Sequence, residues 1–228
     1  MLLFRPKVIH RKNFPMNGAA ILASNHLSFS DSIFLPLVAP RRITFLAKSE
    51  YFTGKGLKGL ISKGFFAGVG QVPIDRSGGR ASEAAVNTAV AILKSGKLLG
   101  IYPEGTRSPD GRLYRGRTGI ARIALEAGVP IVPVAMIGTF EIQPPGQVRP
   151  KIKKVKIAYG EPMDFSHLKD SVRDPAVLRE ITNQVTAAIQ ALSGQEYVDI
   201  YATKAKELLA AGELDAATAE QVADADEN

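Results

Sequence analysis

A histidine and an aspartate stand five positions apart near the start of the chain, as His26 and Asp31 in the segment 25–31. Short polar residues separate them, so the carboxylate can fix one ring nitrogen while the other nitrogen faces a substrate hydroxyl. Such a pair is suited to taking a proton from an alcohol. The plainer alternative is structural: Asp31 would cap the N-terminus of a short helix, and His26 would be a buried hydrogen-bonding residue.

A second segment, 102–108, holds residues that could bind an anion. Arg107 offers a guanidinium group, and Gly105 with Thr106 offers exposed backbone at the end of an expected strand. Glu104 and Arg107 could instead pair with each other, as an acid and a base in one loop usually do. A base for a hydroxyl together with a clamp for an anion suggests group transfer to a phosphorylated alcohol.

The elements that must position these segments are short apolar runs that alternate with helical patterns. We expect strands at 19–24, 43–47, 68–74, 98–102, 131–137 and 155–159. Apolar spacing predicts helices at 80–94 and 118–127, which end before Gly96 and Gly128. The alternation predicts an α/β fold with a mostly parallel central sheet flanked by helices, in which both segments follow strand ends.

The pattern from residue 174 onward is purely helical. Helices are expected at 175–192, 196–211 and 215–223, and we expect them to pack as a C-terminal appendage. No internal repeat or long linker is visible, which favours a single domain.

Composition excludes several kinds of chemistry. Cysteine is absent, so disulfides, thiolate catalysis and Cys-ligated metals are excluded, and we expect no metal site because the chain has three histidines in all. No apolar run approaches the roughly 18 residues of a transmembrane helix, and the apolar N-terminal stretch is too short for a signal peptide. We therefore expect a cytoplasmic protein.

Positive charge is concentrated in the front of the chain. Residues 1–80 hold 12 Lys and Arg against 3 Asp and Glu, within a net charge of +7 for the whole chain. Nucleic acid, an anionic membrane surface, a polyanionic small molecule and a merely solvated basic surface all fit this bias. Aromatic stacking residues are sparse and no nucleic-acid motif is present, so we do not expect a nucleic-acid partner.

The segment 52–66 has two further patterns. Residues 54–59 fit the string G-x-G-x-x-G, but no hydrophobic strand runs into them, so a dinucleotide site is not supported. Apolar residues interleave there with Lys55, Lys58 and Lys63, a mixture that suits an anionic bilayer surface and equally a core-facing helix with a solvated lysine face.

Four segments, in order, resemble the sequence blocks of the glycerolipid acyltransferase family, whose best-known members are 1-acylglycerol-3-phosphate acyltransferases. Residues 25–31 resemble its His-x4-Asp block, and the other three resemblances lie at 72–76, 103–108 and 131–138. The similarity spans roughly residues 20–165. His26 comes so early that we expect none of the long N-terminal membrane-anchoring helices of many relatives.

The resemblance implies a single acyltransferase domain over residues 1–228, with a catalytic core at about 18–165 and C-terminal helices at about 174–223. It implies transfer of an acyl chain from an acyl thioester to the free hydroxyl of lysophosphatidate, which yields phosphatidate. His26 would be the general base and Asp31 would orient its ring.

The resemblance also implies a substrate site made of Lys48, Arg76, Glu104, Gly105, Thr106 and Arg107. Arg107, with Gly105 and Thr106, would hold the acceptor phosphate, while Arg76 and Lys48 would add charge. Glu104 cannot attract a phosphate, so we expect it to orient Arg107 or to bond an acceptor hydroxyl.

No cofactor is implied, because the acyl group arrives on coenzyme A or on acyl carrier protein. Both substrates reside at the membrane, so we expect peripheral contact with anionic lipid on the inner face of the cell membrane. Two alternatives remain: acylation of glycerol 3-phosphate or a glycolipid by the same base, and a non-catalytic membrane lipid-binding protein with the same fold.

Overall fold

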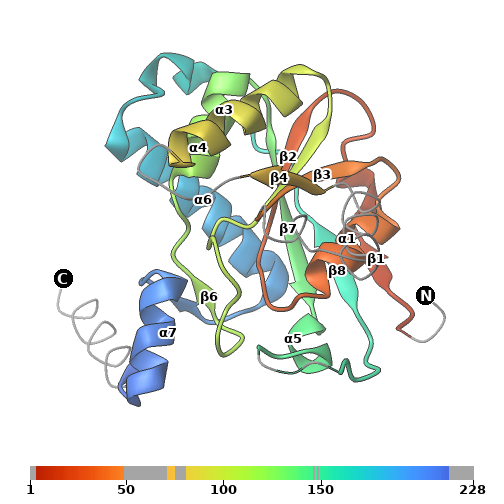
Figure 1. Cartoon of the computed structure of the whole chain (residues 1–228). Coiled ribbons are helices and arrows are strands. Elements are labelled where there is room, and N and C mark those ends of the chain that lie inside the picture. Colours follow the sequence, from red (N-terminus) through yellow and green to blue (C-terminus); the bar gives the residue numbers. More distant parts are fainter. Residues whose placement is uncertain (1–3, 49–70, 75–80, 146, 148, 216–228) are drawn as a thin grey trace, which may run out of the picture.

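A seven-stranded sheet forms the centre of the computed structural model, which describes residues 4–48, 71–74, 81–145, 147 and 149–215 (Figure 1). In sheet order the strands are β1 (Lys7–Ile9), β8 (Lys156–Tyr159), β7 (Ile131–Ile137), β2 (Ala20–Ser24), β5 (Leu98–Ile101), β3 (Ile43–Lys48) and β4 (Gln71–Ile74). The five strands from β7 to β4 are parallel, whereas β8 runs antiparallel to β7 and β1 runs with β8. The predicted mostly parallel sheet is confirmed.

The inner strands are apolar because both of their faces are covered. Every residue of β2 is buried, which is typical of a parallel strand between two helical layers. Side chains alternate between the faces: Ile21 and Ala23 belong to one core cluster, and Ala20 and Leu22 belong to the other.

Helices cover the two faces unequally. The α-helices are α1 (Asp31–Val38), α3 (Ala81–Lys94), α4 (Gly119–Ala127), α5 (Thr139–Ile142), α6 (Pro175–Ser193) and α7 (Ala202–Ala211). Residues of α3, α4 and α6 fill the first cluster, and Phe34 with Leu35 of α1 packs in the second (Figure 1). The described residues also form the short 3-10 helices η1 (Arg11–Asn13) and η3 (Ser166–Ser171).

Local signals account for the ends of the long helix α6. The Asp174 side chain accepts hydrogen bonds from the N–H groups of Ala176 and Val177, and Pro175 occupies the first turn. Gly194 ends the helix in the left-handed conformation, with φ of 70°. The predicted helices at 80–94, 118–127 and 175–192 are thus found, with ends shifted by one residue.

The predicted helix at 196–211 is wrong in its first part. Tyr197–Val198 form strand β9, which pairs in parallel with β6 (Leu113–Tyr114), and α7 begins only at Ala202. Val198 is buried against Tyr114, so a tertiary contact overrides the helical pattern there.

Some predictions lie outside the described residues. These are the first part of the strand expected at 68–74, the segment 52–66 and all but the first residue of the helix expected at 215–223. Among the helices that are described, none combines the length and apolarity needed to cross a bilayer.

Candidate active site

The strand order brings the two candidate segments together. Strands β2 and β5 are parallel neighbours with Ala23 opposite Ile101, so the loops that follow them begin side by side. Two hydrogen bonds then join the loops: Ser108 N–H donates to the His26 carbonyl at 2.7 Å, and His26 N–H donates to Glu104 Oε1 at 3.0 Å.

His26 and Asp31 form a hydrogen-bonded pair. His26 Nδ1 lies 3.0 Å from Asp31 Oδ2, and the same oxygen accepts the N–H groups of Leu27 and Ser28, each at 2.7 Å. Asp31 is fully buried at the start of α1, where the helix dipole favours a carboxylate, while the His26 side chain is 16% exposed. With the Nδ1 proton donated to Asp31, Nε2 is the basic nitrogen.

A tyrosine fixes the plane of the histidine ring. The rings of Tyr102 and His26 stack with centroids 3.9 Å apart and planes 12° apart, and Phe45 stacks on Tyr102 at 5.8 Å. The Tyr102 hydroxyl is hydrogen-bonded to Ser32 at 3.1 Å. Burial, with a further contribution from the Asp31 charge, raises the pKa of Tyr102, so it stays a neutral platform. Sequence reasoning missed this role, although Tyr102 opens the second segment.

Glu104 connects backbone segments instead of orienting Arg107. Its Oε1 accepts the His26 N–H, and its Oε2 accepts the Tyr114 N–H at 3.2 Å. No ion pair joins Glu104 to Arg107 within the described ranges, so the expected partnership with Arg107 is corrected. Glu104 is 1% exposed, and its two oxygens are taken up by these backbone contacts.

Burial raises the pKa of Glu104 to about 8. The N–H donors of His26 and Tyr114 favour the carboxylate and act in the opposite direction, whereas the charges of Asp31 and Asp110 raise the pKa further.

The turn at Gly105 presents the second segment to solvent. Gly105 is exposed with φ of +75°, and its N–H donates to the Tyr102 carbonyl at 3.0 Å. A Cβ atom there would come within 3.0 Å of the Arg117 side chain. Both the conformation and the close approach therefore favour glycine.

Thr106 and Arg107 lie beside a residue that sequence reasoning missed. Lys206 Nζ, from α7, donates to Thr106 Oγ1 at 2.5 Å, across 100 positions of sequence. Arg107 is half-buried and makes no hydrogen bond or ion pair with the described residues. No sequence signal could have found Lys206, because it belongs to a helix outside the four blocks.

The other two predicted substrate residues are placed only partly. Lys48 ends β3, which pairs in parallel with β5, so its backbone lies at the same edge of the sheet as the candidate loops. Arg76 lies outside the described residues. Within the part of the chain that the structure describes, no group of His, Asp and Glu side chains is arranged to hold a metal ion.

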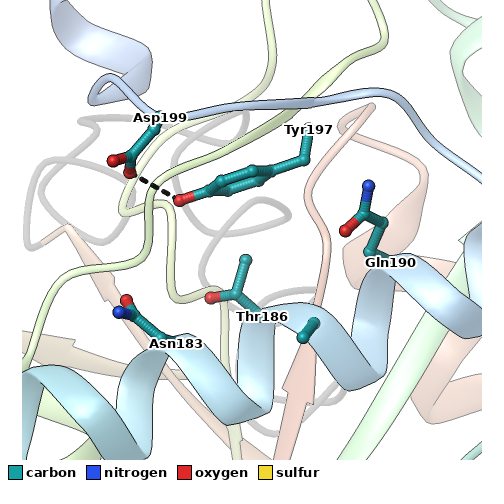
Figure 2. Close-up of a pocket in the computed structure, with 6 residues that line it drawn as sticks. Asn183, Thr186, Gln190, Tyr197 and Asp199 are labelled. Atoms are coloured by element: carbon teal, nitrogen blue, oxygen red, sulfur yellow. Dashed lines mark hydrogen bonds between the residues drawn. The ribbon is translucent and has the colours of Figure 1, made fainter. Parts of the chain in front are cut away.

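A separate hollow of about 320 Å³ lies against α6. Its lining comprises Asn183, Thr186, Ala187, Gln190, Tyr197 and Asp199, and Figure 2 shows the Tyr197 ring lying over the helix with its hydroxyl on Asp199. That hydrogen bond is 2.7 Å long. The lining contains neither a histidine nor a cation, so we place the candidate active site at His26 instead.

Comparison with known proteins identifies the family of the chain. The profile described as Acyltransferase matches residues 5–137. The chain belongs to the acyltransferase family. Among its relatives, the 1-acyl-sn-glycerol-3-phosphate acyltransferase of Bacillus subtilis is 32% identical over 183 residues, which cover 78% of this chain and 84% of that protein.

Other relatives of this acyltransferase are longer or more distant. The chain spans 38% of a chloroplastic 1-acyl-sn-glycerol-3-phosphate acyltransferase from Brassica napus, with 32% identity over 136 residues. The crystal structure of the 1-acyl-sn-glycerophosphate acyltransferase PlsC from Thermotoga maritima matches with a TM-score of 0.65 and 28% identity, covering 84% of this chain and 73% of that one. The resemblance drawn from the four blocks is confirmed, and so is the fold class.

Proposed function

We propose that this acyltransferase moves an acyl chain from an acyl thioester to the free hydroxyl of lysophosphatidate. The observation that carries the proposal is the hydrogen bond between Asp31 Oδ2 and His26 Nδ1, in a ring that keeps partial exposure. The similarity to the Bacillus and Thermotoga acyltransferases, which are named for 1-acyl-sn-glycerol-3-phosphate and 1-acyl-sn-glycerophosphate, supports the same acceptor.

In the proposed reaction His26 Nε2 takes the proton of the acceptor hydroxyl, and the hydroxyl oxygen attacks the carbonyl carbon of the thioester. A carbon–oxygen bond forms, the carbon–sulfur bond breaks, and the leaving thiolate takes the proton back from the imidazolium. Asp31 stabilises that imidazolium and holds the ring in one tautomer. A positioned general base of this kind contributes about 10²–10⁴-fold to the rate.

The phosphate of the acceptor would be held by Arg107 with the Gly105–Thr106 turn, and Lys48 and Arg76 would add positive charge. An arginine can bind a phosphate through two parallel hydrogen bonds, which orients the acceptor as well as attracting it. The donor would be acyl-coenzyme A or acyl carrier protein, and the protein would work peripherally on anionic lipid at the inner face of the cell membrane.

The direct test supplies the purified protein with labelled acyl-coenzyme A and, separately, lysophosphatidate, glycerol 3-phosphate and monoacylglycerol. We expect lysophosphatidate to be the preferred acceptor. His26→Ala should lower kcat by about 10²–10⁴-fold while the melting temperature stays within a few degrees of wild type, because the ring is partly exposed.

His167→Ala is the matched control, because it removes an exposed imidazole from η3. It should leave turnover unchanged. Turnover above about a tenth of wild type in His26→Ala would remove His26 from the role of base.

A further inference from the structure

The C-terminal part of the chain reaches the mouth of the candidate active site. Lys206, in the second turn of α7, donates to Thr106 Oγ1 at 2.5 Å. Besides burial, the charge of Arg107 lowers the pKa of Lys206 and that of Glu104 raises it, so both groups lie close enough to act on its ammonium group. The match to the acyltransferase profile ends at residue 137, well before this helix.

The chain between α6 and α7 is held by specific contacts, which fixes the position of Lys206. Gln195 accepts from Asn25 Nδ2 at 2.6 Å and donates to the Gly111 carbonyl at 2.6 Å, so the residue that precedes His26 is tied to this connection. Strand β9 then pairs with β6, and Figure 2 shows Tyr197 of this strand lying over α6.

The start of α7 is anchored in the same way. The Arg117 guanidinium lies 5.1 Å from the centre of the Tyr201 ring, and Arg179 donates to the Tyr201 hydroxyl at 3.2 Å. Ala202 and Ala205 are fully buried in the same apolar cluster as Tyr114. These contacts hold α7 in place without using the Lys206 side chain.

Three cations surround the Gly105–Thr106 turn. They are Arg107, which follows the turn, Arg117, whose side chain approaches Gly105, and Lys206. Across the described ranges, none of the three forms an ion pair with a carboxylate. The nearby Glu104 is buried, and both of its oxygens accept backbone N–H groups.

This cluster carries an excess of positive charge that an anion would neutralise. Partial burial lowers the pKa of Lys206, and the charge of Arg107 lowers it further. A phosphate bound between them would remove the repulsion between the two cations and would form charge-assisted hydrogen bonds. Because the Thr106 oxygen accepts from Lys206, its own O–H is free to donate to the same phosphate.

We propose that Lys206 is a substrate-binding residue, whose ammonium group joins the Thr106 hydroxyl and the Arg107 guanidinium in binding the acceptor phosphate. Helix α7 thereby completes an acceptor site that the four sequence blocks leave open. The proposal rests on the proposed function, because it assigns Lys206 to the phosphorylated acceptor of that reaction.

The test compares Lys206→Ala, Lys206→Met and Lys206→Arg, with Lys204→Ala as the matched control. Lys204 is exposed, lies on the same helix and pairs with Glu207 at 3.7 Å, away from the turn. Steady-state kinetics with lysophosphatidate should show KM raised about 10–100-fold in the Ala and Met variants, as expected for one lost charge-assisted hydrogen bond. We expect kcat to change far less, Lys206→Arg to recover most of the affinity, and Lys204→Ala to match wild type.

Calorimetric binding of a short-chain lysophosphatidate, without any acyl donor, separates this proposal from the proposed function. Binding by wild type that weakens in Lys206→Met supports the site even if no acyl transfer occurs. If wild type acylates lysophosphatidate and Lys206→Met shows the same KM and the same binding, the role of Lys206 is overturned. The proposed function then stays intact.

Discussion

Both carboxylate oxygens of Glu104 accept backbone N–H groups, one from His26 and one from Tyr114. The side chain is 1% exposed, and burial raises its pKa from 4.5 to about 8. The folded protein therefore keeps a proton that the unfolded chain releases above about pH 4.5. The contribution of Glu104 to the free energy of unfolding is therefore largest at acidic pH and falls as the pH rises towards 8.

Glu104→Gln should flatten that dependence. Each pKa unit by which the folded state exceeds the unfolded state corresponds to about 1.4 kcal/mol. The variant should also be less stable than wild type at pH 5, because both oxygens of the protonated carboxyl can still accept a backbone N–H, whereas the amide NH2 cannot. Urea unfolding followed by circular dichroism at pH 5, 6, 7 and 8 measures both effects.

Glu161→Gln is the control for this experiment, since it removes an exposed carboxylate. This variant should change the free energy of unfolding little and leave its dependence on pH as in wild type. Parallel pH curves for wild type and Glu104→Gln would show that Glu104 does not bind a proton in this range.

At the scale of the elements, the Phe45 ring of strand β3 occupies the space that a side chain at Gly100 of strand β5 would need. A Cβ atom on Gly100 would lie 2.2 Å from the ring of Phe45. That ring stacks on Tyr102, which in turn stacks on His26. The packing between two neighbouring strands therefore sets the plane of the candidate base.

Gly100→Ala should consequently affect both stability and turnover. Overpacking of this kind costs about 1–3 kcal/mol, and displacement of Phe45 should lower kcat by disturbing the stack of Tyr102 on His26. Gly119→Ala in α4 is the matched control, because nothing lies within 4 Å of its added Cβ. Its stability should be unchanged or slightly higher, which denaturant unfolding and the acyl-transfer assay will show. If the stability and turnover of Gly100→Ala matched those of wild type, Phe45 would be able to move without consequence.

At the scale of the whole molecule, the positive charge of residues 1–80 favours an anionic surface as partner. We expect the protein to float with vesicles that contain anionic lipid and to be partly released by high salt, because salt screens the electrostatic share of binding. Charge reversal at Lys55, Lys58 and Lys63, which lie outside the described residues, should weaken this binding and spare activity on a short-chain acceptor.

The vesicle experiment has two informative contrary outcomes. Equal binding to neutral and anionic vesicles would contradict an electrostatic contribution. Unchanged binding in the triple variant would move the docking face elsewhere, and the basic residues near the N-terminus would be tested next: Arg5, Lys7, Arg11 and Lys12.

Much of this architecture could be predicted from the sequence, because its signals are local. The strand at 131–137 is found as β7 (Ile131–Ile137), and α6 differs from its predicted range by one residue. Buried parallel strands are continuous apolar runs, and glycine ends helices, so these patterns need no knowledge of distant residues. The pairing of His26 with Asp31 is equally local, since the two residues flank one short turn.

Only the tertiary structure decided which distant groups meet. The neighbouring positions of β2 and β5 place Glu104 under the His26 backbone, where it serves the loop and not Arg107. The pairing of β9 with β6 replaces a predicted helix and brings Lys206 to Thr106. Strand order and burial depend on how the apolar faces of the strands and helices pack against one another. This packing involves residues 100 or more positions apart in the sequence. Local periodicity therefore defines the elements, while long-range packing determines the partners of each side chain.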